Sequence, residues 1–146
     1  MGQQQLLLII LGVIIVGIAV AVGITMFTGG ARDANRDQVI NDLVNLSAKA
    51  QQFYRRPTAM GGGGNSFNNF QLTIADTGNA NGSYSVTPTL PSGTAFVAGD
   101  TTRYTGAAAG PVYIVGCGKE TGNNAAENVK AYITVGPVTS GTLVLN

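Results

Sequence analysis

The stretch LLLIILGVIIVGIAVAVGITMF, residues 6–27, decides the fold, and its only polar side chain is that of Thr25. No charged residue occurs from position 3 to position 31, and no proline occurs before Pro57. A helix rises about 1.5 Å per residue, so this stretch is about 33 Å long and could cross a bilayer. The sequence therefore predicts an apolar helix that something other than the core of this chain must cover.

The next segment, ARDANRDQVINDLVNLSAKAQQFYRRP, residues 31–57, continues the helix with a different pattern. Its apolar side chains recur every three or four positions, as on one face of a helix, and are those of Val39, Leu43, Leu46, Ala50 and Phe53. Pro57 stops the helix, so one helix of roughly 80 Å is expected from about residue 5 to about residue 56. Asp33 and Arg36 stand three residues apart and are expected to form a weak pair.

Glycines interrupt the apolar half of this helix. Two interpretations remain open for them: they loosen the helix between its halves near residues 23–30, or they reflect the ordinary composition of membrane helices. They are Gly12, Gly17, Gly23, Gly29 and Gly30.

After Pro57, β-branched and alternating runs separated by glycine-rich turns predict strands. The expected strands are 70–75, 83–90, 111–117, 129–135 and 142–145, with weaker ones at 94–98 and 101–105. The fold class is therefore α+β: one very long helix followed by a small antiparallel sheet. Three regions follow: an apolar helix (1–30), its amphipathic continuation (31–56) and a β-rich head (57–146), whose sheet packs on that continuation.

The composition argues against catalysis. The 146 residues include no histidine and one cysteine, Cys117, which excludes Ser-His and Cys-His pairs and most zinc sites. A formal charge of +1 supplies no field for nucleic acid, and no cofactor is expected. The run GCGK, residues 116–119, lacks the flanking residues of a phosphate loop. Cys117 is expected to be a small buried side chain, with an intermolecular disulfide as the alternative.

The layout from Leu6 to Arg56, followed by the strand series, resembles type IV pilins and their secretion-system relatives, the pseudopilins. The resemblance implies that the apolar half-helix holds the subunit in the inner membrane and later becomes the core of a helical filament. It implies a structural, non-enzymatic subunit at the cell surface that polymerises with itself through pilus-type assembly machinery.

The expected assembly residues follow from the apolar run and the polar residues before it. They are Gln4, Gln5, Leu7, Leu8, Ile10, Leu11, Ile14, Ile15 and Ile18. Pilins carry a glutamate near the mature N terminus that pairs with a neighbour's terminal amine, and this chain has Gln3, Gln4 and Gln5 there. Uncharged amides enter an apolar bundle at a lower free-energy cost than a glutamate, so they are expected at a subunit interface.

A second function remains open: a single-pass membrane anchor whose β head binds a partner at the cell surface. The first basic residues, Arg32, Arg36 and Lys49, follow the apolar run, so the positive-inside rule would leave the head of such an anchor in the cytoplasm. A basic leader removed before Met1 would relieve this conflict. Whether Met1 is the initiator or the first residue of a processed chain stays open.

Overall fold

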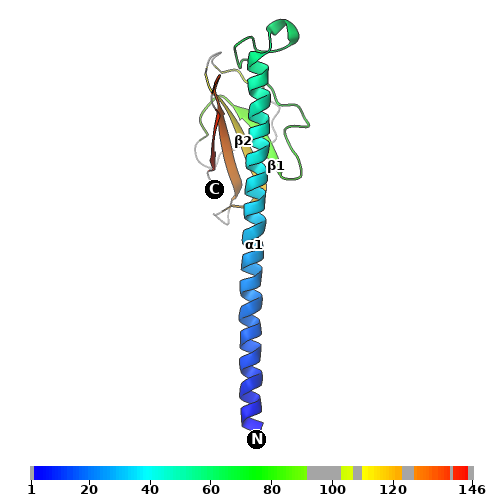
Figure 1. Cartoon of the computed structure of the whole chain (residues 1–146), viewed down its shortest axis with the longest axis vertical. Coiled ribbons are helices and arrows are strands. Elements are labelled where there is room, and N and C mark those ends of the chain that lie inside the picture. Colours follow the sequence, from blue (N-terminus) through cyan, green and yellow to red (C-terminus); the bar gives the residue numbers. More distant parts are fainter. Residues whose placement is uncertain (1, 92–102, 107–109, 123–126, 139, 145–146) are drawn as a thin grey trace.

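The computed structural model describes residues 2–91, 103–106, 110–122, 127–138 and 140–144. One long helix, α1 (Gly2–Arg55), precedes a short 3-10 turn, η1 (Thr58–Met60), and a sheet. The strands β1 (Gly82–Thr87), β2 (Val112–Thr121), β3 (Asn128–Val135) and β4 (Ser140–Val144) pair in sequence order, all antiparallel. Figure 1 shows the sheet lying along the upper half of α1. The predicted α+β class is confirmed.

Helix α1 contains 54 residues, which corresponds to about 80 Å. It runs without interruption from Gly23 to Gly30, so the first of the two interpretations of these glycines, a loosened helix, is not observed in this structure. The helix ends at Arg55, and the chain then folds back over the helix end. There the backbone amides of Gly63 and Asn65 donate hydrogen bonds of 2.8 Å to the carbonyls of Phe53 and Tyr54, in the last turn of the helix.

The best-patterned strands are observed close to their predicted positions. Those expected at 111–117, 129–135 and 142–145 appear as β2, β3 and β4, and the one at 83–90 appears as the shorter β1. The strand expected at 70–75 is wrong, because that segment is irregular and ends in a turn. Residues 103–105 likewise form no strand, while 94–98, 101 and 102 lie outside the described residues.

One face of the sheet packs against the predicted apolar stripe of α1. Val39, Leu43 and Ala50 are fully buried there, as are Ile114 and Val135 of the sheet. Aromatic and leucine side chains from the connecting segments complete the same cluster, namely Phe67, Phe70, Leu72 and Tyr104. The core of the head is therefore shared between the sheet and the second half of α1, as the stripe predicts.

Two glycines of the GCGK run let β2 approach α1 closely. A Cβ atom at Gly116 would lie 2.9 Å from Cγ1 of Val39 and 3.0 Å from the ring of Tyr84. A Cβ atom at Gly118 would lie 2.1 Å from Oδ1 of Asn35. This run therefore serves helix–sheet packing, a role that its sequence alone does not indicate.

Candidate membrane and assembly surface

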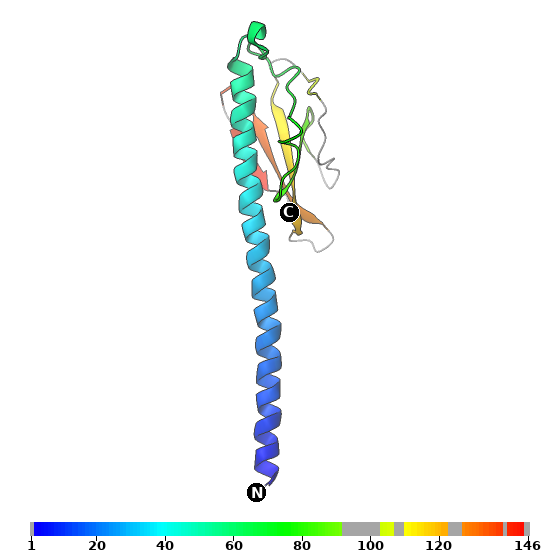
Figure 2. The same ribbon diagram turned by 90° about the vertical axis from the view of Figure 1, so that its right-hand side faces the viewer.

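The first half of α1 is an apolar surface that nothing in the described chain covers. We call residues 2–28 the stem; every one of them is exposed. The exposed fractions of its large apolar side chains run from 50% at Val22 to 79% at Phe27. Figure 2 shows the stem extending well beyond the head. By length and composition, α1 could cross a membrane.

The predicted apolar assembly residues all lie on this stem, and the structure does not set them apart from their neighbours. Equally exposed apolar side chains, not singled out from the sequence, complete the surface: Leu6, Ile9, Val13, Val16, Val20, Val22, Ile24, Met26 and Phe27. Successive residues of a helix are about 100° apart, so these side chains cover the whole circumference. A helix that is apolar all round is surrounded on all sides, by lipid or by several neighbouring helices.

The two threonine hydroxyls of the stem already donate hydrogen bonds within the helix. The hydroxyl of Thr25 donates to the carbonyl of Val22 at 2.8 Å, and that of Thr28 donates to the carbonyl of Ile24 at 3.1 Å. Such bonds leave no unpaired hydroxyl to be desolvated in an apolar medium. The glutamines at the start of the helix differ from these threonines. The side-chain amides of Gln4 and Gln5 have no hydrogen-bond partner in the described part of the chain.

A carboxylate in the middle of α1 ties the helix to the first strand. Oδ2 of Asp42 accepts three hydrogen bonds. The donors are the hydroxyl of Tyr84 at 2.6 Å and the side-chain amides of Asn79 at 2.7 Å and Asn81 at 3.3 Å. Burial raises the pKa of Asp42, but these three donors outweigh it and hold the pKa of this carboxyl below its usual value. The Asn81-Gly82 turn is thus anchored on the helix.

A second link lies nearer the end of α1. Lys49 forms an ion pair with Asp76, whose other oxygen accepts a hydrogen bond of 2.7 Å from the hydroxyl of Thr73. Burial raises the pKa of Asp76, and the hydrogen bonds and charge of its partners bring it below the usual range. Together with Asp42 this pair holds the irregular segment before β1 against the helix.

Among the described residues, Asn35 makes the hydrogen bonds between α1 and the head that lie nearest to the stem. Its side-chain amide donates a hydrogen bond of 2.9 Å to the backbone carbonyl of Asn81. Its Oδ1 accepts one of 3.4 Å from the backbone amide of Glu120. We call these three residues the rim of the head. Half-buried Arg36 and Arg32 lie at and just below this level, and the Nε atom of each is buried without a hydrogen-bond partner in the described ranges.

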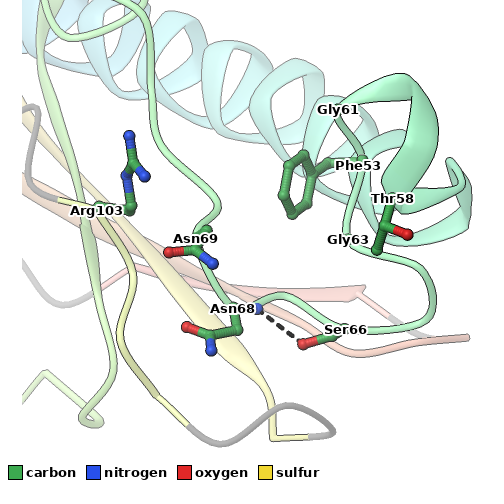
Figure 3. A pocket seen from close by; sticks show the side chains of 9 residues that line it. Phe53, Thr58, Gly61, Gly63, Ser66, Asn68, Asn69 and Arg103 are labelled. Carbon is green, nitrogen blue, oxygen red and sulfur yellow. Dashed lines mark hydrogen bonds between the residues drawn. The ribbon is translucent and has the colours of Figure 1, made fainter.

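An open hollow of about 470 Å³ lies at the other end of the head. Figure 3 shows it between Phe53 of α1, the loop around Asn68 and Asn69, and Arg103. The side chains of Asn68, Asn69 and Arg103 are exposed and have no partner among the described residues. Amide and guanidinium donors around an aromatic ring suit a polar or anionic ligand. Thr58 of η1 also lines the hollow, and Figure 1 shows this turn at the end of the molecule opposite the N terminus.

Cys117 is half-buried on β2. Burial raises the pKa of its thiol, although the charge of Lys130 acts in the opposite direction. A raised pKa lowers the thiolate fraction, which disfavours the intermolecular disulfide weighed above. Among the residues that the structure describes, no group of three or more His, Cys, Asp or Glu side chains could hold a metal ion.

Comparisons with protein-family models, with curated proteins and with solved structures found no match to this chain.

Proposed function

We propose that this chain is the structural subunit of an extracellular type IV pilus-like filament, assembled through the stem. The observation that supports it is an apolar surface covering the whole circumference of a helix whose other half is built into a folded head. In this proposal the stem first holds the subunit in the inner membrane as a single-pass segment. Pilus-type assembly machinery then transfers it into a bundle of identical stems at the cell surface.

The energetics of burial favour this assignment. Covering one Leu or Ile side chain that would otherwise meet water is worth roughly 1.5 to 3 kcal/mol, so stems that have left the membrane are held together by burial against one another. A bundle of stems replaces lipid with close-packed side chains of the same character, so no polar group is stranded in the exchange. The proposal gives the chain no catalytic role and no nucleic-acid partner, since it lacks histidine and has a formal charge of +1.

The test replaces Ile14, which lies in the stem and is 53% exposed, with aspartate. A carboxylate without a cationic partner is strongly disfavoured inside an apolar bundle. Negative-stain microscopy of sheared cell-surface material should show uniform filaments for the natural chain and none for Ile14→Asp. The matched control is Ile74→Asp, because Ile74 is an exposed apolar residue of the head, 84% accessible, and its replacement should leave filaments intact. Filaments of normal yield from Ile14→Asp would contradict the proposal.

A second candidate function is a membrane-anchored monomer whose head binds a partner. The hollow beside Arg103 favours it, since it gathers polar groups that have no partner among the described residues, at the end of the head farthest from the stem. The same microscopy separates the two candidates. An anchor would leave no filaments in sheared material, and crosslinking in the membrane would recover the natural chain as single copies.

A further inference from the structure

Two arginines occupy an unusual position where the stem meets the head. Arg32 and Arg36 come seven and three residues before the buried Val39, which places both on the side of α1 that faces the head. Both are half-buried, yet their Nε atoms are buried without a hydrogen-bond partner in the described chain. A buried donor without an acceptor is unfavourable by about 1 to 3 kcal/mol, and more when it is charged. The terminal nitrogens of both guanidinium groups are not buried and have no partner among the described residues, so an acceptor from outside can reach them.

The nearby carboxylates do not supply it. Asp33 and Asp37 are exposed, and each follows an arginine, so each lies about 100° around the helix from it. The pair expected between Asp33 and Arg36 does not form: among the described residues, the ion pairs join Lys49 to Asp76 and Lys130 to Glu127. Charges of the same sign therefore stand four residues apart on α1. Arg32 and Arg36 form a positive edge on the side of the head, and Asp33 and Asp37 form a negative edge beside it.

The charged side chains of the head nearest to this positive edge do not pair with it. Lys119 and Glu120 are exposed at the end of β2, and Glu120 meets α1 through its backbone amide, which donates to Asn35. No ion pair links either of these side chains to the arginines within the residues that the structure describes.

When the stem lies in a membrane, the backbone of Arg32 lies at the outer edge of the headgroup layer and that of Arg36 about 6 Å farther out. With Leu6 to Phe27 filling the hydrocarbon layer, Arg32 lies about 7 Å and Arg36 about 13 Å beyond it along the helix. The headgroup layer is about 5 to 7 Å thick on each side. The Cα–Cβ bonds of a helix tilt toward its N terminus, so both side chains leave the backbone in the direction of that layer.

We infer that Arg32 and Arg36 form a binding site for the phosphate of an anionic phospholipid, beneath the rim of the head. The planar guanidinium presents parallel N–H donors that match two phosphate oxygens, and its two terminal nitrogens supply them here because Nε is buried. Residues four apart on a helix have Cβ atoms about 5 to 6 Å apart, so both side chains reach one phosphate. This inference rests on the membrane stage of the proposed function and not on the filament. The site would orient the head on the membrane before assembly.

The experiment uses the full chain in nanodiscs made of equal amounts of phosphatidylglycerol and phosphatidylcholine. Native mass spectrometry then reports the lipids retained on the protein after release from the disc. We expect the natural chain to retain phosphatidylglycerol over phosphatidylcholine about fivefold, the effect of about one net cation at an anionic surface, since Asp33 and Asp37 offset part of the attraction. The double variant Arg32→Gln/Arg36→Gln removes both cations and leaves Asp33 and Asp37 in place, so it should retain no more phosphatidylglycerol than phosphatidylcholine.

The matched control is Arg55→Gln/Arg56→Gln, which removes the same charge at the other end of the helix. It should keep the natural preference. Equal preference in Arg32→Gln/Arg36→Gln and the natural chain would overturn the inference, as would equal loss in the control. Inorganic phosphate that binds the chain in lipid-free micelles as tightly as the lipid does would make this a free-anion site and also overturn it.

Failure of the membrane stage gives a different result. In that case alkaline carbonate would extract the natural chain from vesicles of either lipid, and both the proposal and this inference would fall. A natural chain that resists extraction and retains both lipids equally would overturn the inference alone.

Discussion

The hydroxyl of Tyr84 donates a hydrogen bond of 2.6 Å to the carboxylate of Asp42, joining β1 to α1 across 42 positions of sequence. Tyr84 is fully buried, and burial followed by the contact with Asp42 raises the pKa of its hydroxyl. The tyrosine therefore stays protonated as a donor, and the carboxylate stays charged as its acceptor. This bond helps to hold the sheet on the helix that carries the stem.

Replacing either partner should loosen the head. We expect Tyr84→Phe to lower the free energy of unfolding by about 1 kcal/mol and Asp42→Asn by about 1 to 2 kcal/mol, because hydrogen bonds to a charged group are the stronger ones. The measurement is thermal unfolding of the full chain in detergent, followed by circular dichroism. The double variant should be less destabilised than the sum of the two, and strict additivity would contradict a direct coupling.

Acid should weaken the same contacts. The pKa values of Asp42 and Asp76 are lower in the folded chain than in the unfolded chain, where a free aspartate titrates near 3.9. Their contribution to stability is therefore complete above about pH 4 and is lost as the pH falls through the lower folded values. Unfolding temperatures measured from pH 7 to pH 2 should drop below about pH 4. Asp42→Asn should show a shallower drop, and an unchanged profile in that variant would contradict this role.

The close approach of β2 to α1 should not tolerate a side chain at Gly116. Gly116→Ala places a methyl group against Val39 and the ring of Tyr84, and overpacking of this kind destabilises by about 1 to 3 kcal/mol. The matched control is Gly141→Ala in β4, where an added Cβ meets nothing within 4 Å. Chemical unfolding should separate the two variants. Natural stability in Gly116→Ala would show that the helix and the sheet have room to move apart.

The glutamines at the start of α1 provide a test of the assembled state. In a bundle of stems, Gln4 and Gln5 would bond to neighbouring chains, so Gln4→Leu/Gln5→Leu should lower filament yield or alter the helical parameters seen by electron microscopy. The control is Gln52→Leu on the exposed side of the head half, which should leave both unchanged. Unaltered filaments from the double variant would place these amides in contact with solvent or headgroups only.

The helix and most strands could be predicted from sequence because their signals are local. No proline occurs before Pro57, and the apolar residues from Val39 to Phe53 recur at helical spacing, so these two features predict one helix. Neither feature depends on the rest of the chain. The same holds for the β-branched runs of β2 and β3. The uncovered apolar stem also follows from sequence, since no other segment is long and apolar enough to cover it.

Tertiary structure alone decided where the less regular residues lie. The segment 70–75 alternates like a strand, yet its backbone pairs elsewhere: the carbonyl of Phe70 accepts from the amide of Tyr104, and Asp76 closes a turn onto Thr73. Alternation places Phe70 and Leu72 in the core with Ile74 outside, and that burial pattern holds without a ladder. The Tyr84–Asp42 hydrogen bond and the packing of Gly116 against Val39 likewise join residues distant in sequence, which local periodicity does not encode. The same is true of the burial of the Arg32 and Arg36 Nε atoms, which have no hydrogen-bond partner among the described residues.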